Sequence, residues 1–98
     1  MGVLLNLGVL AKALNECLHA LLLQSFSDLR SDLLQRGKLR IANVVKTNYY
    51  LRDASQVAVV REIRSKYFIK ELPASTLVEV PRLANPDFLI EIEVIAVV

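Results

Sequence analysis

The sequence predicts an α+β domain in which two main helices pack on one face of a small mixed β-sheet. Apolar residues between positions 11 and 37 recur at helical spacings, and a second helical pattern covers positions 57–68. Segments rich in β-branched residues alternate at 41–52, after Pro73 and at 89–98. The expected order is helix, strand, helix, strand, strand, with the option of one strand before the first helix.

Composition limits the classes of function that are open to the chain. It has 98 residues, enough for one domain over positions 1–98, and 54% of them are hydrophobic, which favours burial of surface between subunits. The net charge is +2 with Lys and Arg scattered, so no nucleic-acid partner is expected. Cys17 is the single cysteine, which excludes an internal disulfide and multi-Cys metal sites. We expect no metal and no cofactor.

The N-terminal residues 1–10 are apolar but have no basic segment before them, as a signal peptide would. Lys12, Glu16 and His19 interrupt the apolar stretch that follows, so a membrane span is not expected. We therefore expect a soluble protein without a membrane partner, in the cytoplasm or alternatively the mitochondrial matrix. Residues 2–10 fit a short buried strand or the start of a helix, because periodicity does not separate the two in so short a run.

The first helical pattern runs without Pro or Gly to Gly37, which is expected to be the residue that ends the helix in the left-handed conformation. Ser27 is also a suitable N-cap for a helix that starts at Asp28, so one long helix and two shorter ones are both open. The apolar positions of this pattern are Leu14, Leu18, Leu21, Leu22, Phe26, Leu29 and Leu33.

In the next segment, strand alternation places one set of side chains on one face and their neighbours on the other. The two sets are Val45, Thr47, Tyr49, Leu51 and Val44, Lys46, Asn48, Tyr50. Asp53 then fits an N-cap or turn residue. The second helix is expected to bury Val57, Val60, Ile63 and Tyr67, with Phe68 beside them, and Pro73 ends helical continuation.

The C-terminal strand carries an unusual pair of carboxylates. Its wholly apolar face, which should be buried, comprises Ile90, Ile92, Val94, Ala96 and Val98. The other face holds Glu91 and Glu93 among Leu89, Ile95 and Val97. Carboxylates on a face otherwise fit for burial usually have a partner or a function.

Four segments in this order resemble the second half of the RidA/YjgF family, the imine deaminases formerly called L-PSP endoribonucleases. They are residues 43–53, the helix that ends in Lys66-Tyr-Phe68, residues 73–80 and residues 90–97, and the resemblance extends from about Ser27 to Val98. It implies a homotrimer of chorismate-mutase-like subunits with a ligand cleft at each subunit interface. Residues 1–24 do not align, and are expected to be a divergent or truncated N-terminal part.

The resemblance also implies site residues. In the family, an Arg of a Pro-Ala-Arg-Ser segment holds the substrate carboxylate, and a Glu of a Glu-Ile-Glu strand positions the water that hydrolyses a 2-imino or 2-enamino acid to a 2-keto acid and ammonia. Glu91 matches this acidic position and is the candidate catalytic residue. Ser75 stands where the family has the Arg, which removes a bidentate clamp. Arg61 and Arg64 stand where many members have an Asn and a Tyr, and Leu77 stands where a Cys is common.

Each candidate also has a structural interpretation. Glu91 fits an ion pair with Arg82 or Lys46 as well as catalysis, and Glu79 and Glu93 are expected to be structural. Ser75 and Thr76 fit a role in holding a carboxylate or that of ordinary strand hydroxyls. Arg61 and Arg64, at i and i+3, fit replacement of the missing cation or a solvated face. One of Tyr49 and Tyr50 is expected to wall the cleft or to lie in the core.

These considerations predict a RidA-like hydrolytic deaminase of the 2-iminobutanoate and 2-iminopropanoate type, weak or inactive because Ser75 replaces the clamp. Its expected ligand is a small carboxylate-bearing metabolite at the subunit interface, bound by Ser75, Thr76, Arg61 and Tyr49. The alternative is a non-catalytic trimeric protein of the same fold that binds a metabolite or a partner. An endoribonuclease finds no support, because neither a basic groove nor an acid–base histidine is visible.

Overall fold

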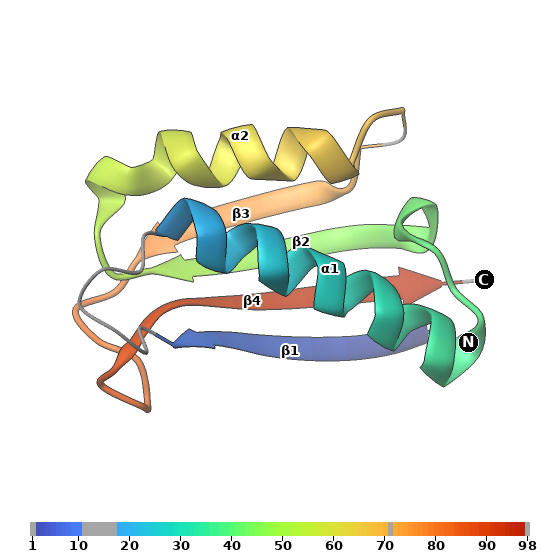
Figure 1. Cartoon of the computed structure of the whole chain (residues 1–98), viewed down its shortest axis with the longest axis horizontal. Helices are drawn as coiled ribbons and strands as arrows, with labels where there is room; N and C mark the ends of the chain where they lie inside the picture. Colours follow the sequence, from blue (N-terminus) through green and yellow to red (C-terminus); the bar gives the residue numbers. More distant parts are fainter. Residues whose placement is uncertain (1, 11–17, 71, 98) are drawn as a thin grey trace.

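The computed structural model describes residues 2–10, 18–70 and 72–97, and the side chains of residues 18–70 and 72–97. These residues form four strands and two α-helices, with short 3₁₀ turns before β2 and α2 (Figure 1). The elements are β1 (Gly2–Leu10), α1 (Leu18–Gly37), β2 (Val44–Leu51), α2 (Val57–Tyr67), β3 (Ala74–Glu79) and β4 (Phe88–Val97). The predicted order of elements is confirmed, and the first segment is a strand.

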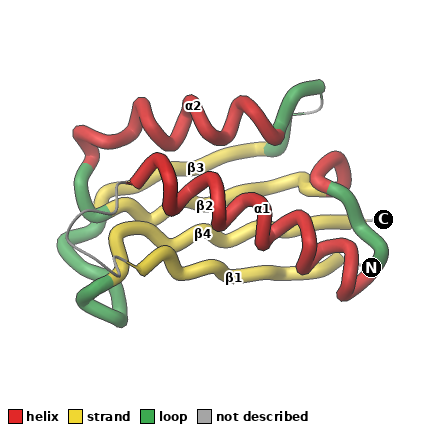
Figure 2. The backbone as a smooth tube through the Cα atoms, viewed as in Figure 1, coloured by secondary structure: helices red, strands yellow, loops and turns green. Residues whose placement is uncertain are grey.

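The four strands form one mixed sheet in the order β1-β4-β2-β3 (Figure 2). β4 pairs antiparallel with both β1 and β2, whereas β2 and β3 run parallel on either side of the α2 crossover. Both helices cover the same face of this sheet (Figure 1). The expected α+β class, with helices on one face of a mixed sheet, is therefore confirmed. The uncovered face of the sheet is called the open face below.

β4 lies inside the sheet and divides its side chains as the alternation predicts. Ile90, Ile92, Val94 and Ala96 are buried under the helices, and Glu91, Glu93 and Ile95 lie half-buried on the open face. Val98, the last residue of the predicted apolar set, lies outside the described residues. A strand with one wholly apolar face needs a cover, and the two helices supply it.

The first half of β2 departs from simple alternation. Val44 is 3% exposed and Val45 is 46% exposed, although the sequence pattern assigned Val45 to the same face as Thr47. The cause is a register shift against β4 between Val44 and Lys46, where an extra residue interrupts the pairing. The predicted faces of Val44 and Val45 were thus wrong. From Thr47 to Leu51 the predicted alternation is confirmed.

The first helical pattern forms a single helix, α1, rather than two shorter ones. Its buried residues are Leu18, Leu22, Phe26, Leu29 and Leu33, as the spacing predicts, while Leu14 lies outside the described residues. The expected role of Gly37 is contradicted. Lys38 adopts the left-handed conformation instead, with φ of 55°, and no described glycine has a positive φ. The N–H groups of Lys38 and Leu39 then donate to the carbonyls of Leu34 and Leu33.

The start of α2 is fixed by two carboxylates. The Asp53 side chain caps the 3₁₀ turn Ala54–Gln56 by accepting hydrogen bonds from the backbone N–H and the hydroxyl of Ser55. Glu79, at the end of β3, accepts a further bond of 2.9 Å from the Ala54 N–H. Unpaired N–H groups at a helix start need such acceptors. The expected cap at Asp53 is confirmed, and Glu79 has a structural role.

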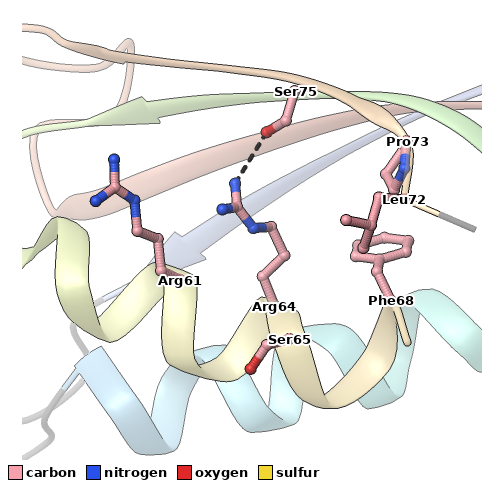
Figure 3. Close-up of a pocket in the computed structure, with 7 residues that line it drawn as sticks. All are labelled: Arg61, Arg64, Ser65, Phe68, Leu72, Pro73 and Ser75. Atoms are coloured by element: carbon pink, nitrogen blue, oxygen red, sulfur yellow. Dashed lines mark hydrogen bonds between the residues drawn. The ribbon is translucent and has the colours of Figure 1, made fainter. Parts of the chain in front are cut away.

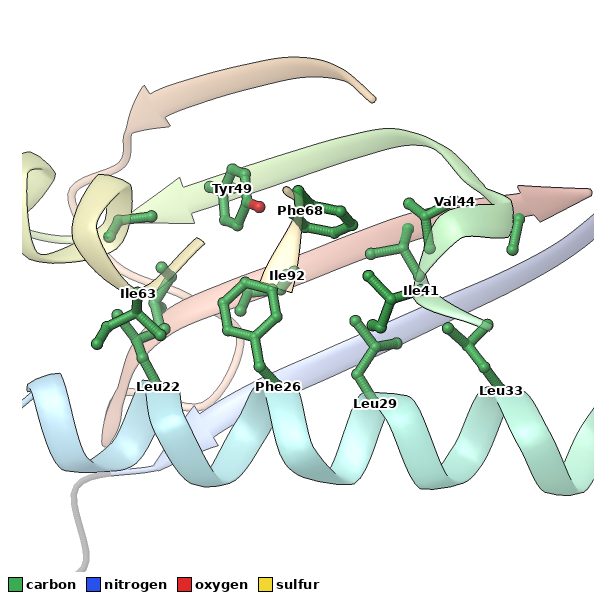
Figure 4. Packing of buried hydrophobic residues seen from close by; sticks show 14 of the residues in the cluster. Leu22, Phe26, Leu29, Leu33, Ile41, Val44, Tyr49, Ile63, Phe68 and Ile92 are labelled. Atoms are coloured by element: carbon green, nitrogen blue, oxygen red, sulfur yellow. The ribbon is translucent and has the colours of Figure 1, made fainter. Parts of the chain in front are cut away.

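The core lies between the helices and the covered face of the sheet (Figure 4). Phe26 of α1 stacks on Tyr67 at 5.1 Å between ring centroids and meets Phe68 edge-on at 6.0 Å. The Tyr67 hydroxyl donates to the Leu23 carbonyl at 3.3 Å. Val60, Ile63 and Phe68 are buried as predicted, whereas Val57 and Tyr67 are only half-buried. These contacts fix the C-terminal end of α2 against α1, and thereby fix α2 relative to β3.

Candidate functional site

A cavity of about 230 Å³ opens between α2 and the start of β3 (Figure 3). Two arginines and Ser75 supply its polar side-chain groups, and three apolar residues complete its wall, while the Ser65 hydroxyl points away and donates to the Glu62 carbonyl. The lining residues are Arg61, Arg64, Ser65, Phe68, Leu72, Pro73 and Ser75. This volume suits a small metabolite, because sites for drug-sized ligands usually begin near 300 Å³.

Arg64 is the central polar residue of this cavity. Its Nη1 donates a hydrogen bond of 3.0 Å to the Ser75 hydroxyl, and its guanidinium carbon lies 5.9 Å from the centroid of the Tyr49 ring. Arg64 is half-buried and Arg61, one helical turn before it, is exposed. Figure 3 shows both side chains reaching from α2 toward β3. The spacing of three residues places both guanidinium groups on one flank of the helix.

The hydroxyl groups of Thr47 and Tyr49 on β2 are buried on the helix-covered face of the sheet, close to the cavity. Ser75 is the pairing partner of Thr47 on β2, and Tyr49 follows two residues later on the same face. Thr47 and Tyr49 are both 0% exposed, and neither the Thr47 Oγ1 nor the Tyr49 Oη makes a hydrogen bond of good geometry. Burial raises the pKa of Tyr49 above its ordinary value of 10.0, and the nearby Thr47 hydroxyl and Arg64 guanidinium oppose that rise only in part. Tyr49 is therefore a neutral core residue at neutral pH.

The charge of the cavity is positive. Among the described residues, the contacts within 4.0 Å between basic and acidic side chains are His19 with Glu62 and Arg36 with Asp32, and neither involves Arg61 or Arg64. Arg64 instead contacts a neutral hydroxyl. Guanidinium groups bind carboxylates in a planar, bidentate geometry. The arrangement is thus suited to hold the carboxylate of a small ligand.

Glu91, the candidate catalytic residue, lies elsewhere. Its Cα partner on β2 is Tyr50, which places it on the open face, whereas Ser75 and Arg64 lie on the helix-covered side. Thr76 pairs with Asn48 and also belongs to the open face. Within one chain, Arg61 and Ser75 therefore line the same cavity, and Tyr49 lies near it through its contact with Arg64. Glu91 and Thr76 lie on the opposite face of the sheet, away from this cavity.

The other acidic candidates have structural contacts. Glu93 accepts a hydrogen bond of 2.9 Å from the Asn48 amide across the β2–β4 pair. The ion pairs proposed for Glu91 with Arg82 or Lys46 are not formed among the described residues. Cys17 lies outside these residues. Within the described part of the chain, no group of three or more His, Cys, Asp or Glu side chains is placed to hold a metal ion.

Sequence reasoning did not identify the apolar wall of the cavity, formed by Phe68, Leu72 and Pro73. The signal was present in Pro73, which ends the segment after α2 and directs β3 alongside it.

A second hollow of about 350 Å³ lies beside the 3₁₀ turn before β2, lined by Ile41, Ala42 and residues 67–70. None of the candidate site residues lines it. No described helix has the length and apolarity that crossing a bilayer requires.

The sequence model of the family described as endoribonuclease L-PSP matches residues 12–98. A RutC family protein of Pyrococcus abyssi is 41% identical over 64 residues, which cover 65% of this chain and 50% of that relative. A RutC family protein of Pasteurella multocida is 37% identical over 78 residues, covering 76% and 59% of the two chains. The chain thus spans about half the length of the curated relatives it matches.

Solved structures agree with the sequence comparison. A member of the YjgF/YER057c/UK114 family from Mycobacterium tuberculosis has a TM-score of 0.82 and 30% identity, over 100% of this chain and 81% of that one. RidA from the Antarctic bacterium Psychrobacter sp. has a TM-score of 0.77 and 28% identity, over 88% of this chain and 68% of that one. The family match begins at residue 12, whereas the sequence segments resemble the family only from about Ser27. The chain therefore belongs to the endoribonuclease L-PSP family, the group that includes the YjgF and RidA proteins.

Proposed function

We propose that this protein is a hydrolytic deaminase that converts small 2-imino or 2-enamino acids to 2-keto acids and ammonia. Membership of the family that contains RidA supports the reaction class. The observation that carries the proposal is the 3.0 Å hydrogen bond from Arg64 Nη1 to Ser75 Oγ. The Arg64 guanidinium, which comes from α2, therefore lies next to Ser75 of β3. Ser75 is the position at which the family resemblance leads us to expect an Arg. Arg64 is then the residue that holds the substrate carboxylate.

The reaction needs few parts beyond this clamp. Water adds to the imine carbon as a base takes one of its protons, and the base passes that proton to the nitrogen. The carbon–nitrogen bond then breaks as the hydroxyl proton is transferred to the nitrogen, so that the carbonyl forms and ammonia leaves. A carboxylate suits the role of base when it lies within hydrogen-bond reach of the water. Glu91 is the candidate, and the Arg64 clamp fixes the imine carbon relative to it.

A complete site requires more than one copy of the chain. Glu91 lies on the open face of the sheet, and the cavity lies on the covered side next to β3. β3 is an edge strand of the sheet, so a neighbouring copy is able to approach it closely. We place a neighbour's Glu91 at the cavity in a homotrimer. The open face, with half-buried Leu89 and Ile95 beside Glu91, supplies apolar surface for such an association.

A second candidate function is non-catalytic binding of a small acid in the same cavity. The separation of Glu91 from Arg64 within one chain favours this alternative, because the cavity alone contains cations and hydroxyls but no carboxylate. Both candidates share the ligand class and the Arg64 contact. They differ only in whether Glu91 reaches the ligand.

Ammonia release from freshly generated 2-aminoacrylate or 2-iminobutanoate separates the two. We expect release above the spontaneous rate, loss of that excess in Glu91→Gln, and a decrease in kcat/KM of about 10- to 100-fold in Arg64→Gln, the cost of one charged hydrogen-bonding partner. Lys66→Gln removes an equal charge from the exposed side of α2 and serves as the control. Release no faster than the spontaneous rate, with 2-oxobutanoate still bound, would establish the binding protein instead.

A further inference from the structure

The cavity beside α2 holds two guanidinium groups, although one carboxylate needs only one. Arg61 and Arg64 both line it, and both side chains reach toward β3 (Figure 3). Side chains three residues apart on a helix are neighbours, with Cβ atoms about 5–6 Å apart. The ligand therefore meets two positive charges at a distance set by one helical turn.

The two charges have no internal counter-ion among the residues whose side chains are described. The nearest acidic residue on the helix, Glu62, faces His19 of α1 at 3.9 Å. Like charges one turn apart on a helix repel each other. A ligand with one carboxylate bound to Arg64 would leave Arg61 without a partner, whereas a second anionic group would neutralise it as well.

The third wall of the cavity is apolar. Phe68, Leu72 and Pro73 line it next to Arg64, on the side away from Arg61 (Figure 3), and Phe68 is part of the buried core. An apolar surface next to Arg64 suits the short aliphatic part of an organic acid whose carboxylate binds Arg64. A compact dianion such as phosphate would use the charges but not this wall.

From these features we infer that the cavity takes a short dicarboxylic acid, with one carboxylate on Arg64 and the other on Arg61. The inference rests on the proposed function of the same site, and names its substrate class as the 2-imino acid derived from a dicarboxylic amino acid. Arg61 is then the residue that determines specificity, and Arg64 holds the carboxylate common to all substrates.

Calorimetric titration of the full chain with glutarate and pentanoate tests this inference without any turnover. The two ligands have the same carbon chain and differ by one carboxylate. We expect glutarate to bind about fivefold more tightly, the effect of one solvent-exposed ion pair. Arg61→Gln should abolish the preference, because glutarate loses more affinity than pentanoate, whereas Arg64→Gln should weaken the binding of both ligands. Lys66→Gln should keep the preference, and circular dichroism should show that all variants fold.

Four results would overturn the inference. The first three are equal affinity for glutarate and pentanoate, an equal loss of affinity for both ligands in Arg61→Gln, and no binding of either. Phosphate that binds as tightly as glutarate would also overturn it, because the cavity would then not distinguish an organic diacid from an inorganic anion. The deaminase proposal fails by a different result, the absence of ammonia release, so a binding preference without turnover separates the two failures.

Discussion

Arg64 and Ser75 are eleven residues apart in sequence and are joined by a 3.0 Å hydrogen bond from a helix to an edge strand. The contact connects the two sides of the cavity, since Arg64 belongs to α2 and Ser75 to β3. It also explains how the chain keeps a positive charge, that of Arg64, beside position 75, where the strand itself carries only a neutral serine hydroxyl. The guanidinium is supplied from the helix, and the strand contributes an acceptor for it.

A reciprocal exchange tests whether the position of the guanidinium on the chain matters. Arg64→Ser should weaken binding of 2-oxobutanoate by about tenfold or more, because a charged partner is lost. The double variant Arg64→Ser, Ser75→Arg should regain most of that affinity, because the guanidinium returns to the same cavity from the strand. Calorimetry on the wild type, on each single variant (Arg64→Ser and Ser75→Arg) and on the double variant gives the coupling free energy between the two positions. Additive losses in the double variant would contradict a shared role.

The buried hydroxyl of Tyr49 leads to a prediction on stability and its pH dependence. Tyr49→Phe should raise the free energy of unfolding by about 1 kcal/mol at neutral pH, because the Oη is buried without a good hydrogen bond. Burial raises the pKa of this phenol, so the native state keeps the proton when the unfolded state, with a pKa near 10.0, loses it. The stability that depends on the protonated Tyr49 phenol is therefore fully present below pH 10.0. It is lost as the pH rises from that value through the higher native pKa.

Urea unfolding between neutral pH and pH 11 measures both effects. The wild type should lose more stability than Tyr49→Phe on the alkaline side, and Tyr50→Phe, on the open face, is the matched control. An identical alkaline slope for wild type and Tyr49→Phe would show that the Tyr49 phenol is accessible to solvent in the native state.

Periodicity predicted the helices and the faces of β4 because it depends only on positions along one element. The buried set from Leu18 to Leu33 follows the helical repeat, and Ile90 to Ala96 follows the strand repeat. The exchange of faces at Val44 and Val45 was not predictable in this way. It arises from the register shift against β4, and pairing with another strand is not encoded in the local pattern.

Lys38 ends α1 at a backbone conformation that suits glycine better. Its φ of 55° is in the left-handed region, which costs an L-residue with a Cβ roughly 1 kcal/mol. Lys38→Gly should therefore stabilise the protein by about 0.5–1 kcal/mol. Gly37→Ala should not destabilise it, because no described glycine has a positive φ.

Thermal or urea unfolding of both variants checks this assignment. Lys70→Gly is the control, since it makes the same substitution at an exposed position with a negative φ. A loss of stability in Gly37→Ala together with no gain in Lys38→Gly would return the left-handed position to Gly37, where the sequence pattern placed it.

The candidate site was predictable only in its residue types. The spacing of Arg61 and Arg64 on one helix flank follows from the sequence, but their approach to Ser75 depends on how α2 packs across β3. That packing is set by distant contacts such as the stacking of Phe26 on Tyr67. The separation of Glu91 from Ser75 likewise follows from the strand order, in which β2 lies between β4 and β3.

The cap formed by Asp53 gives a final prediction, on the acid side of the pH range. The hydroxyl and backbone N–H of Ser55 both donate to this carboxylate and lower its pKa below the usual 3.8. The native state therefore releases the proton more readily than the unfolded state. The stabilisation is present above pH 3.8 and is lost as the pH falls through the lower native pKa.

Asp53→Ala should consequently lower Tm at neutral pH, and the difference from wild type should shrink as the pH is lowered below 3.8. Asp53→Asn is the matched control, because its amide oxygen is still able to accept from the Ser55 N–H without a charge that titrates. It should retain part of the neutral-pH stability and show less acid dependence than wild type. A Tm deficit in Asp53→Ala that stays constant down to strongly acidic pH would mean that the ionised carboxylate contributes nothing beyond its shape. In that case the Glu79 bond to the Ala54 N–H would be the main anchor at the start of α2.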